Sequence, residues 1–300
     1  MKQVEERYIS LLTDFGFKRI FGTAMNKDLL ICFLNSLFNG RQVVKDVSYL
    51  NPEHVGDVYT DRKAIFDVYC EGENGEKFIV EMQNAYQAYF KDRSLFYSTF
   101  PIREQAPKGN DWDFKLNHVY TVALLNFNMN EDAFDKEKIR HHVQLCDTAT
   151  HKIFYDKLEF IYVEIAKFNK TLGELETLYE KWLYALKNLY KLTQRPKELC
   201  DKVFDRLFEE AEIAKFTPQE MREYEASKMA YRDIKNSIDT AKQEGLAEGM
   251  EKGMKKGMEK GMNQKALDIA RNMLADSVDI NLIMKYSGLT QEQIEKLNFP

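Results

Sequence analysis

Two acidic residues and a glutamine stand inside strongly apolar runs in the first third of the chain. Asp67 lies within KAIFDVYC, and Glu81 and Gln83 lie within FIVEMQ. Residues two apart on a strand point to the same face, so Glu81 and Gln83 project together. Carboxylates on neighbouring strands can bind Mg²⁺ or Mn²⁺, which prefer oxygen ligands. Because such an ion activates water and stabilises charge on a phosphodiester, the pattern is consistent with metal-dependent hydrolysis.

A less specific interpretation of Asp67 and Glu81 stays open. Acids are common on the solvent-facing side of half-exposed strands, and short motifs of this kind are weak predictors of a site. Against that interpretation, acids are rarely left among apolar residues without a partner or an ion. Spacing alone does not decide between a metal site and an exposed strand face.

Helical and strand patterns around the two acids predict an α/β domain. Apolar residues at three-and-four spacing predict a helix over 26–39 and another over 89–105. Residues rich in Ile, Val, Phe and Tyr predict strands over 43–51, 63–72, 76–83, 118–127 and 157–165, with a further strand near 142–148. The turn at 73–76 is expected to close a β-hairpin that brings Asp67 to Glu81.

Composition sets broad limits on the class of protein. The chain has 300 residues, 44% of them hydrophobic, which suffices for a sizeable core. The sequence lacks a long apolar run and a secretory signal, so we expect a cytoplasmic protein with no membrane segment. The four cysteines have no zinc-finger spacing and are interpreted as reduced. A net charge of −5 excludes binding to DNA through bulk attraction alone, but a local basic patch can still contact it.

The C-terminal part of the chain is predicted to be helical. Helical periodicity runs from 172 to about 238, and the chain ends in two short amphipathic helices with a capping-box pattern at Thr290 and Gln293. Between these parts, glycine recurs every four residues from Gly245 to Gly261. Each glycine costs a helix about 1 kcal/mol relative to alanine, so we favour a charged linker or loosely helical tail over an oligomerisation stalk.

These changes of pattern divide the chain into four parts. The α/β domain is predicted over 1–168 and a helical region over 169–240. The glycine repeat follows over 241–264, as a linker or a helix, and a short helical end covers 265–300. A homo-oligomer formed through the C-terminal helices stays open as an alternative to the linker.

The order of elements resembles the core of the PD-(D/E)XK nucleases, in which a mixed sheet is flanked by helices in a restriction-endonuclease-like fold. EMQ resembles the E-x-Q variant of the last motif of that superfamily. TDFGFKRIFG followed by LLICFLNSLFNG, together with the EKGM tail, resembles the branch of recombination-promoting nucleases and transposases. The resemblance covers most of the chain. It implies a Mg²⁺- or Mn²⁺-dependent DNA endonuclease associated with recombination or mobile elements.

Carried over to this sequence, the resemblance implies that Asp67 and Glu81 bind the metal. Gln83 then stands where many superfamily members have a catalytic lysine. Glutamine can orient a group through hydrogen bonds but cannot supply a cation. Either activity is weak or another base acts. The candidates for that base are Lys63, Lys77 and Lys91.

Two further pairs of residues, each four apart, could belong to the site. Asp14 and Lys18 match the opening motif of the family and share one face if that segment is helical. In one interpretation Asp14 is a further acid near the metal and Lys18 is its neighbouring cation. In the other, the two residues form an ordinary surface ion pair. Arg93 and Tyr97 could contact a phosphate, but we favour an exposed arginine beside a tyrosine at the edge of the core.

Two other functions compete with a nuclease. The chain could keep the nuclease fold without activity and only bind DNA, because fold does not fix function. The glutamine at position 83 favours this alternative. The chain could also be an oligomer organised by its C-terminal helices, with the α/β domain as a platform for partners.

Overall fold

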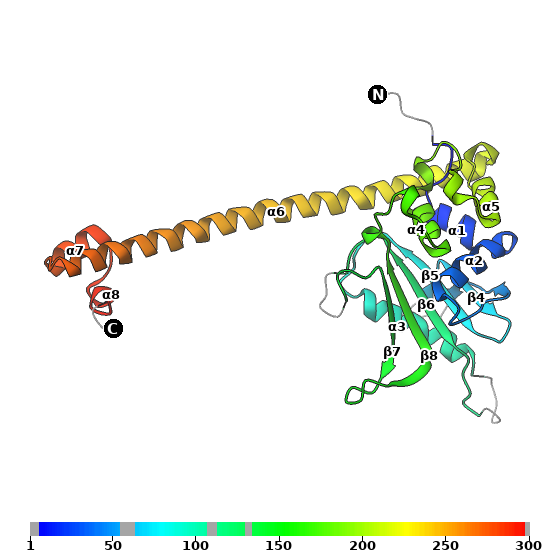
Figure 1. The fold of residues 1–300 in the computed structure, drawn as a ribbon, viewed down its shortest axis with the longest axis horizontal. Coiled ribbons are helices and arrows are strands. Elements are labelled where there is room, and N and C mark those ends of the chain that lie inside the picture. Colours follow the sequence, from blue (N-terminus) through cyan, green and yellow to red (C-terminus); the bar gives the residue numbers. More distant parts are fainter. Residues whose placement is uncertain (1–5, 55–63, 107–112, 130–133, 298–300) are drawn as a thin grey trace. The chain divides into compact units, whose positions relative to one another are not determined.

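The computed structural model describes residues 6–54, 64–106, 113–129 and 134–297 (Figure 1). Lys63, one of the candidate bases, lies outside the described residues. The chain divides into two compact units, Met1–Lys235 and Asn236–Pro300. Each unit is described by itself below.

The first unit is built on a mixed β-sheet. Its strands, with a separate two-stranded ribbon, are β1 (Val47–Tyr49), β2 (Glu53–His54), β3 (Ala64–Ile65), β4 (Val68–Gly72), β5 (Lys77–Gln83), β6 (Val119–Leu125), β7 (Arg140–Cys146) and β8 (Ile153–Glu164). Among the described residues, six strands form one sheet in the order β1-β4-β5-β6-β8-β7, and β2 pairs with β3. β5, β6 and β8 are parallel, and the outer pairs are antiparallel.

Helices account for most of the remaining chain. They are α1 (Asp14–Phe21), α2 (Lys27–Phe38), α3 (Phe90–Glu104), α4 (Leu178–Asn188), α5 (Lys202–Glu210), α6 (Pro218–Ala275), α7 (Ile280–Ser287) and α8 (Gln291–Glu295). Short 3₁₀ helices cover Ala24–Asn26, Ile165–Lys167, Leu172–Glu174, Leu189–Lys191, Lys197–Leu199 and Ile213–Lys215. The helices predicted over 26–39 and 89–105 are confirmed as α2 and α3.

The predicted hairpin is confirmed, and the strand predicted over 63–72 is present with one interruption. β4 pairs with β5, and Gly75 takes a φ of +82° in the turn between them, a conformation that favours glycine. The strand is interrupted at Phe66 and Asp67, so it becomes β3 and β4. Phe66 packs edge-on against the Tyr69 ring, while the Asp67 carboxylate accepts a hydrogen bond from the backbone of Met82.

Alternating residues of β5 face two different cores. Phe78 and Val80 belong to the main core, which the sheet shares with α1, α2, α4 and α5. Ile79 belongs to a smaller core with Phe66 and Tyr69, against which residues of α3 pack. Figure 1 shows α1, α2, α4 and α5 gathered on one side of the sheet. Because side chains alternate along a strand, Glu81 and Gln83 lie on the α3 face with Ile79.

The helices after the sheet complete the main core. The Trp182 ring of α4 is fully buried and lies 5.7 Å from the Phe21 ring and 5.9 Å from the Phe33 ring. Phe204 of α5 contacts the same indole at 5.1 Å. A fully buried aromatic or aliphatic side chain stabilises the fold by roughly 1.5–3 kcal/mol. The helical segment over 178–210 is thus packed into the core of the sheet.

The glycine repeat, predicted as a linker or a helix, is helical. It lies inside α6, which runs without interruption from Pro218 to Ala275. Residues with high helix propensity fill the positions between the glycines, and Lys252 forms an ion pair with Glu248 one turn away. These contributions oppose the cost of the glycines.

The second unit ends in two short helices. Thr290 and Gln293 form the predicted capping box at the start of α8. Ala270 of α6, Ile283 of α7 and Ile294 of α8 are fully buried against one another. Within the described part of the chain, no helix has the length and apolar character needed to cross a bilayer.

Candidate active site

Glu81 is a buried acid on the α3 face of the sheet. Its side chain comes from the central part of the first unit, where β5 lies between β4 and β6. Only 8% of the residue is exposed, and burial together with the negative charge of Asp67 raises the pKa of Glu81 to about 8, against a smaller opposing effect of Arg93. Among the described residues, no hydrogen-bond partner reaches the buried Glu81 Oε1. The carboxyl group therefore retains an unused oxygen inside the protein.

Asp67 meets Glu81 because the β4–β5 register brings the two together. Regular pairing ends at Val68 and Val80, which directly adjoin Asp67 and Glu81, and the charge of Asp67 acts on Glu81. Asp67 Oδ2 accepts a hydrogen bond from Met82 N at 2.8 Å. Burial raises the pKa of the Asp67 carboxyl, while the Met82 N–H group and the nearby cations lower it. Two negatively charged carboxylates this close together repel each other, so a nearby positive charge would stabilise their ionised forms.

Arg93 of α3 supplies one such charge. Its Nη2 lies 3.9 Å from Glu81 Oε2 and donates a hydrogen bond to Gln83 Oε1. Its Nη1 donates to Gln87 Oε1 at 2.6 Å, and the guanidinium carbon lies 5.7 Å from the centre of the Tyr97 ring. The sequence predicts an exposed arginine beside a tyrosine at the edge of the core; Arg93 does lie beside Tyr97, but its side chain is only 28% exposed. Arg93 sits one helical turn before Tyr97, and the packing of α3 onto the sheet turns both toward the acids.

Asp14 and Lys18 form the surface ion pair that their spacing allowed. Lys18 Nζ lies 2.8 Å from Asp14 Oδ1 on α1, and both side chains are largely exposed. Their charges nevertheless act on Asp67, because Lys18 lowers and Asp14 raises the pKa of its carboxyl group. The two interpretations are therefore compatible. The pair is exposed and also lies close enough to Asp67 to influence its charge.

The other candidate bases differ in position. Lys77 lies at the opposite end of β5 from Gln83, where its Nζ binds Glu71 Oε2 at 2.7 Å. Lys91 lines a separate pocket beside α3. Neither lysine is placed at the acids, so the cations that act on them in the described residues are Arg93 and Lys18. Sequence reasoning included Lys18 but gave Arg93 too little weight.

The arrangement fits a divalent cation with few protein ligands. Among the described residues, no group of three or more His, Cys, Asp or Glu side chains could hold a metal ion. The pair of Asp67 and Glu81 remains, with the partnerless Glu81 Oε1 as the available oxygen. Mg²⁺ is often bound by one or two carboxylates while waters and substrate phosphates supply the other ligands. The fit is therefore to a hard cation such as Mg²⁺ or Mn²⁺.

Comparison with known protein families gives two matches, one for each part of the chain. Residues 11–241 match the family model described as PD-(D/E)XK nuclease family transposase. Residues 263–298 match the model described as Rpn/YhgA-like nuclease family, C-terminal HTH domain. No curated protein and no solved structure matches the chain significantly.

The chain belongs to the PD-(D/E)XK nuclease family transposases, because the first match spans well over half of it. The fold is the α/β restriction-endonuclease-like core that the sequence predicted. The second match covers the end of α6 with α7 and α8, which identifies this part as a helix–turn–helix domain. Sequence reasoning predicted its helices but missed the domain, because two short amphipathic helices carry no specific signal.

Proposed function

We propose that this chain is a metal-dependent DNA endonuclease in which Asp67 and Glu81 hold Mg²⁺ or Mn²⁺. The observation that carries the proposal is the buried Glu81 Oε1, which has no partner in the described residues, in a carboxyl group whose pKa the nearby Asp67 raises. Membership of the nuclease family supports the hydrolysis of phosphodiesters. The association with recombination or mobile elements rests on the family alone.

Arg93 takes the part that a lysine at position 83 plays elsewhere. A bound Mg²⁺ or Mn²⁺ would supply an activated water and stabilise charge on the leaving oxygen. Gln83 and Gln87 hold the Arg93 guanidinium through two hydrogen bonds, so its direction is fixed before substrate arrives. A guanidinium can donate two parallel hydrogen bonds to a phosphate. Gln83 therefore acts as a positioning residue for Arg93.

DNA binding is proposed for both units of the chain. The helix–turn–helix match supports contact with duplex DNA by the C-terminal helices. Lys285 and Tyr286 lie on α7, and Tyr286 is 64% exposed. These two exposed side chains are the proposed contacts of this unit with the DNA.

Plasmid cleavage tests the proposal. Purified protein with Mg²⁺, Mn²⁺, Ca²⁺ or EDTA is incubated with supercoiled DNA beside Asp67→Ala and Glu81→Ala. We expect nicking that needs Mg²⁺ or Mn²⁺ and falls about a thousandfold in both variants. Glu71→Ala is the matched control, because Glu71 lies on the same hairpin but pairs with Lys77. If Asp67→Ala and Glu81→Ala both still cut the plasmid, the assignment of these two residues as the metal site would be wrong.

A catalytically silent DNA-binding protein is the competing outcome. Gln83 favours it, because the lysine of the family motif is absent. If the chain binds duplex DNA but fails to nick it with every cation, the nuclease fold here serves binding alone. Loss of metal-dependent cleavage in Arg93→Ala would instead show that the arginine replaces the lysine.

We further infer that α6 pairs with α6 of a second copy. Within the described residues, nothing lies within 4 Å of a Cβ atom built on any of the glycines from Gly245 to Gly261. These glycines weaken the helix without easing any contact in their own chain. Close approach of another helix would use the space. Met250, Met254, Met258 and Met262 are 67–75% exposed on the same segment.

The charges along this segment favour an antiparallel pair. From Asp239 to Glu251 acids outnumber bases, and from Lys255 to Lys265 bases outnumber acids. An antiparallel pair centred on Gly253 would place each half against the opposite charge. Light scattering on the full chain tests this. Gly253→Leu should shift the measured mass from that of a dimer to that of a monomer, whereas the control Ala247→Leu should leave the dimer intact. A parent protein that is itself a monomer would contradict the pairing of α6.

A further inference from the structure

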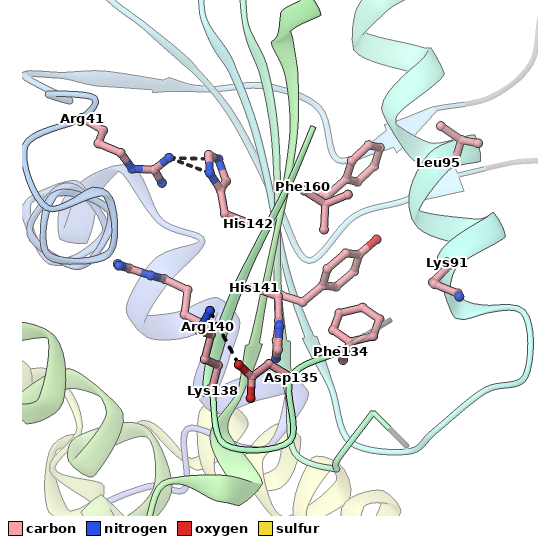
Figure 2. A pocket seen from close by; sticks show the side chains of 12 residues that line it. Arg41, Lys91, Leu95, Phe134, Asp135, Lys138, Arg140, His141, His142 and Phe160 are labelled. Atoms are coloured by element: carbon pink, nitrogen blue, oxygen red, sulfur yellow. Dashed lines mark hydrogen bonds and ion pairs between the residues drawn. The ribbon is translucent and has the colours of Figure 1, made fainter. Parts of the chain in front are cut away.

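A pocket of about 820 Å³ lies apart from the acids, between α3 and the β7–β8 hairpin. We call it the α3 pocket. Leu95 of α3 lines it on one side, and Phe134, Phe160 and Tyr162 line it on the other. Figure 2 shows Leu95 and Lys91 on α3 facing Phe134 and Phe160 across this space. The Phe160 and Tyr162 rings are parallel within 6°, with 6.4 Å between their centres.

Cations surround this aromatic wall. Lys91 and Lys138 border the pocket on the side of α3 and of the loop before β7, and Arg41 and Arg140 border it past the edge strand β7. Among the described lining residues, Asp135 is the only acid, and its carboxylate lies 3.6 Å from Lys138 Nζ. Phe134, Phe160 and Tyr162 are only 6%, 8% and 4% exposed, so a ligand would touch them at the floor of the pocket. Positive charge beside such an aromatic lining suits a ligand with an anionic group and a planar ring. A nucleotide has both.

The α3 pocket and the acids share one face of the sheet. Glu81 pairs with Ala123, Ala123 with Tyr162, and Tyr162 with His141, so these residues form one row across β5, β6, β8 and β7. Three strand spacings cover about 14 Å. About four stacked nucleotides span that distance, at roughly 3.4 Å each.

The start of α3 separates the two places. The Phe90 ring packs edge-on against Tyr162 at 6.0 Å, so it covers the row between Glu81 and the pocket. Arg93 points from α3 to the acids, whereas Lys91 and Leu95 point to the pocket. Tyr89, the residue directly before the helix, is 78% exposed. A chain passing from the acids to the pocket would go around this tyrosine.

We propose that one strand of the DNA runs from the acids around Tyr89 and places a nucleotide in the α3 pocket. This inference rests on the proposed nuclease function, because it gives the path of the same substrate. The base lies against the wall formed by Phe134 and Phe160, and its phosphate lies near Lys138. The pocket thereby fixes which phosphate reaches Glu81.

Binding of single-stranded DNA to the full chain in EDTA tests the path. The probe is a labelled oligothymidylate of about 12 nucleotides, a length that covers the acids and the pocket. We expect Leu95→Glu and Lys138→Glu each to weaken binding about tenfold. Phe96→Glu is the control for Leu95→Glu on α3, and Lys136→Glu is the control for Lys138→Glu on the loop before β7. Each control changes the charge by the same amount as its partner variant, but at a residue that does not line the pocket. Controls should stay within about twofold of the parent protein.

The outcomes separate this inference from the nuclease assignment. If the pocket variants and their controls bind the oligothymidylate equally well, the proposed path of the DNA strand is wrong, even if the protein cuts the plasmid. Weaker binding in the pocket variants would support the path even if the plasmid is not cut. Thymidine monophosphate should compete poorly with the oligonucleotide. Competition at equal concentration would show a site for free nucleotides and would overturn the strand path.

Discussion

The acid site on the sheet and the glycine repeat of α6 both hold residues that weaken the isolated chain. Glu81 is a buried acid whose Oε1 has no partner in the described residues, and it faces Asp67. The glycines between Gly245 and Gly261 stand in a helix with open space around them. In the first case the missing partner is as small as an ion, because the group is enclosed. In the second it is as large as a helix, because the surface is open.

This difference tells which experiments are informative. A buried acid pair responds to cations and to pH, because protonation and metal binding both neutralise it. An exposed glycine stripe responds to protein concentration and to side-chain volume. Stability should therefore depend on pH and Mg²⁺ through the first unit, and on concentration through α6.

The largest expected effect is on the pH dependence of stability without metal. The pKa of Glu81 is raised from 4.5 in the unfolded chain to about 8 in the fold, so the folded state holds the proton more tightly. Its contribution to stability is present below about pH 4.5 and falls as pH rises toward 8, by roughly 4 to 5 kcal/mol. Urea unfolding at several pH values in EDTA measures this loss.

Glu81→Gln is the control for this pH dependence. The amide does not titrate, so most of the slope should disappear, leaving the smaller contribution of Asp67, whose pKa is also raised. Added Mg²⁺ should likewise oppose the loss in the parent protein. If the free energy of unfolding of Glu81→Gln changed with pH as steeply as that of the parent protein, Glu81 would not be the cause of the pH dependence.

The next effect concerns the arginine at the acids. Arg93→Ala should lower plasmid cleavage about a hundredfold, because it removes the cation held by Gln83 and Gln87. Arg93→Lys should recover part of the rate, since lysine keeps the charge but not the two-pronged geometry. Arg103→Ala, at the last turn of the same helix, is the control. Equal loss in both alanine variants would point to a weakened helix.

A smaller effect is expected when a glycine of the repeat is replaced by alanine. Gly249→Ala should stabilise α6 by about 1 kcal/mol, because nothing lies near the added methyl group. Thermal unfolding followed by circular dichroism of dilute full chain measures it. A loss of stability that appears only at high protein concentration would show that the methyl group meets another molecule.

The smallest effect is expected at the opening motif. Lys18→Ala should reduce cleavage a few-fold, because the lysine acts on Asp67 from an exposed position where solvent weakens the interaction. Raising the salt concentration should shrink the difference between the variant and the parent protein. A loss as large as that of Arg93→Ala would place Lys18 in direct contact with substrate.

The sequence predicted the parts of this molecule that depend on local pattern. The period-two alternation of FIVEMQ predicted that Glu81 and Gln83 share a face, and they do. The break at Asp67 was not predictable, because the contacts of Phe66 with Tyr69 and of Asp67 with the Met82 N–H group form only in the folded chain. The direction in which Arg93 points depends on how α3 packs against the sheet, which the sequence pattern does not specify. The helicity of the glycine repeat depends on a balance of small opposing energies, which the pattern does not decide either.

Calorimetric titration of Mn²⁺ into the metal-free protein at pH 7, in buffers of different ionisation enthalpy, tests the central claim most directly. With a pKa of about 8, Glu81 is mostly protonated at this pH. We expect Mn²⁺ to bind the parent protein and to release about one proton. Glu81→Gln should bind far more weakly and release almost none. Equal binding by this variant, or binding without proton release by the parent protein, would contradict a cation site at Asp67 and Glu81.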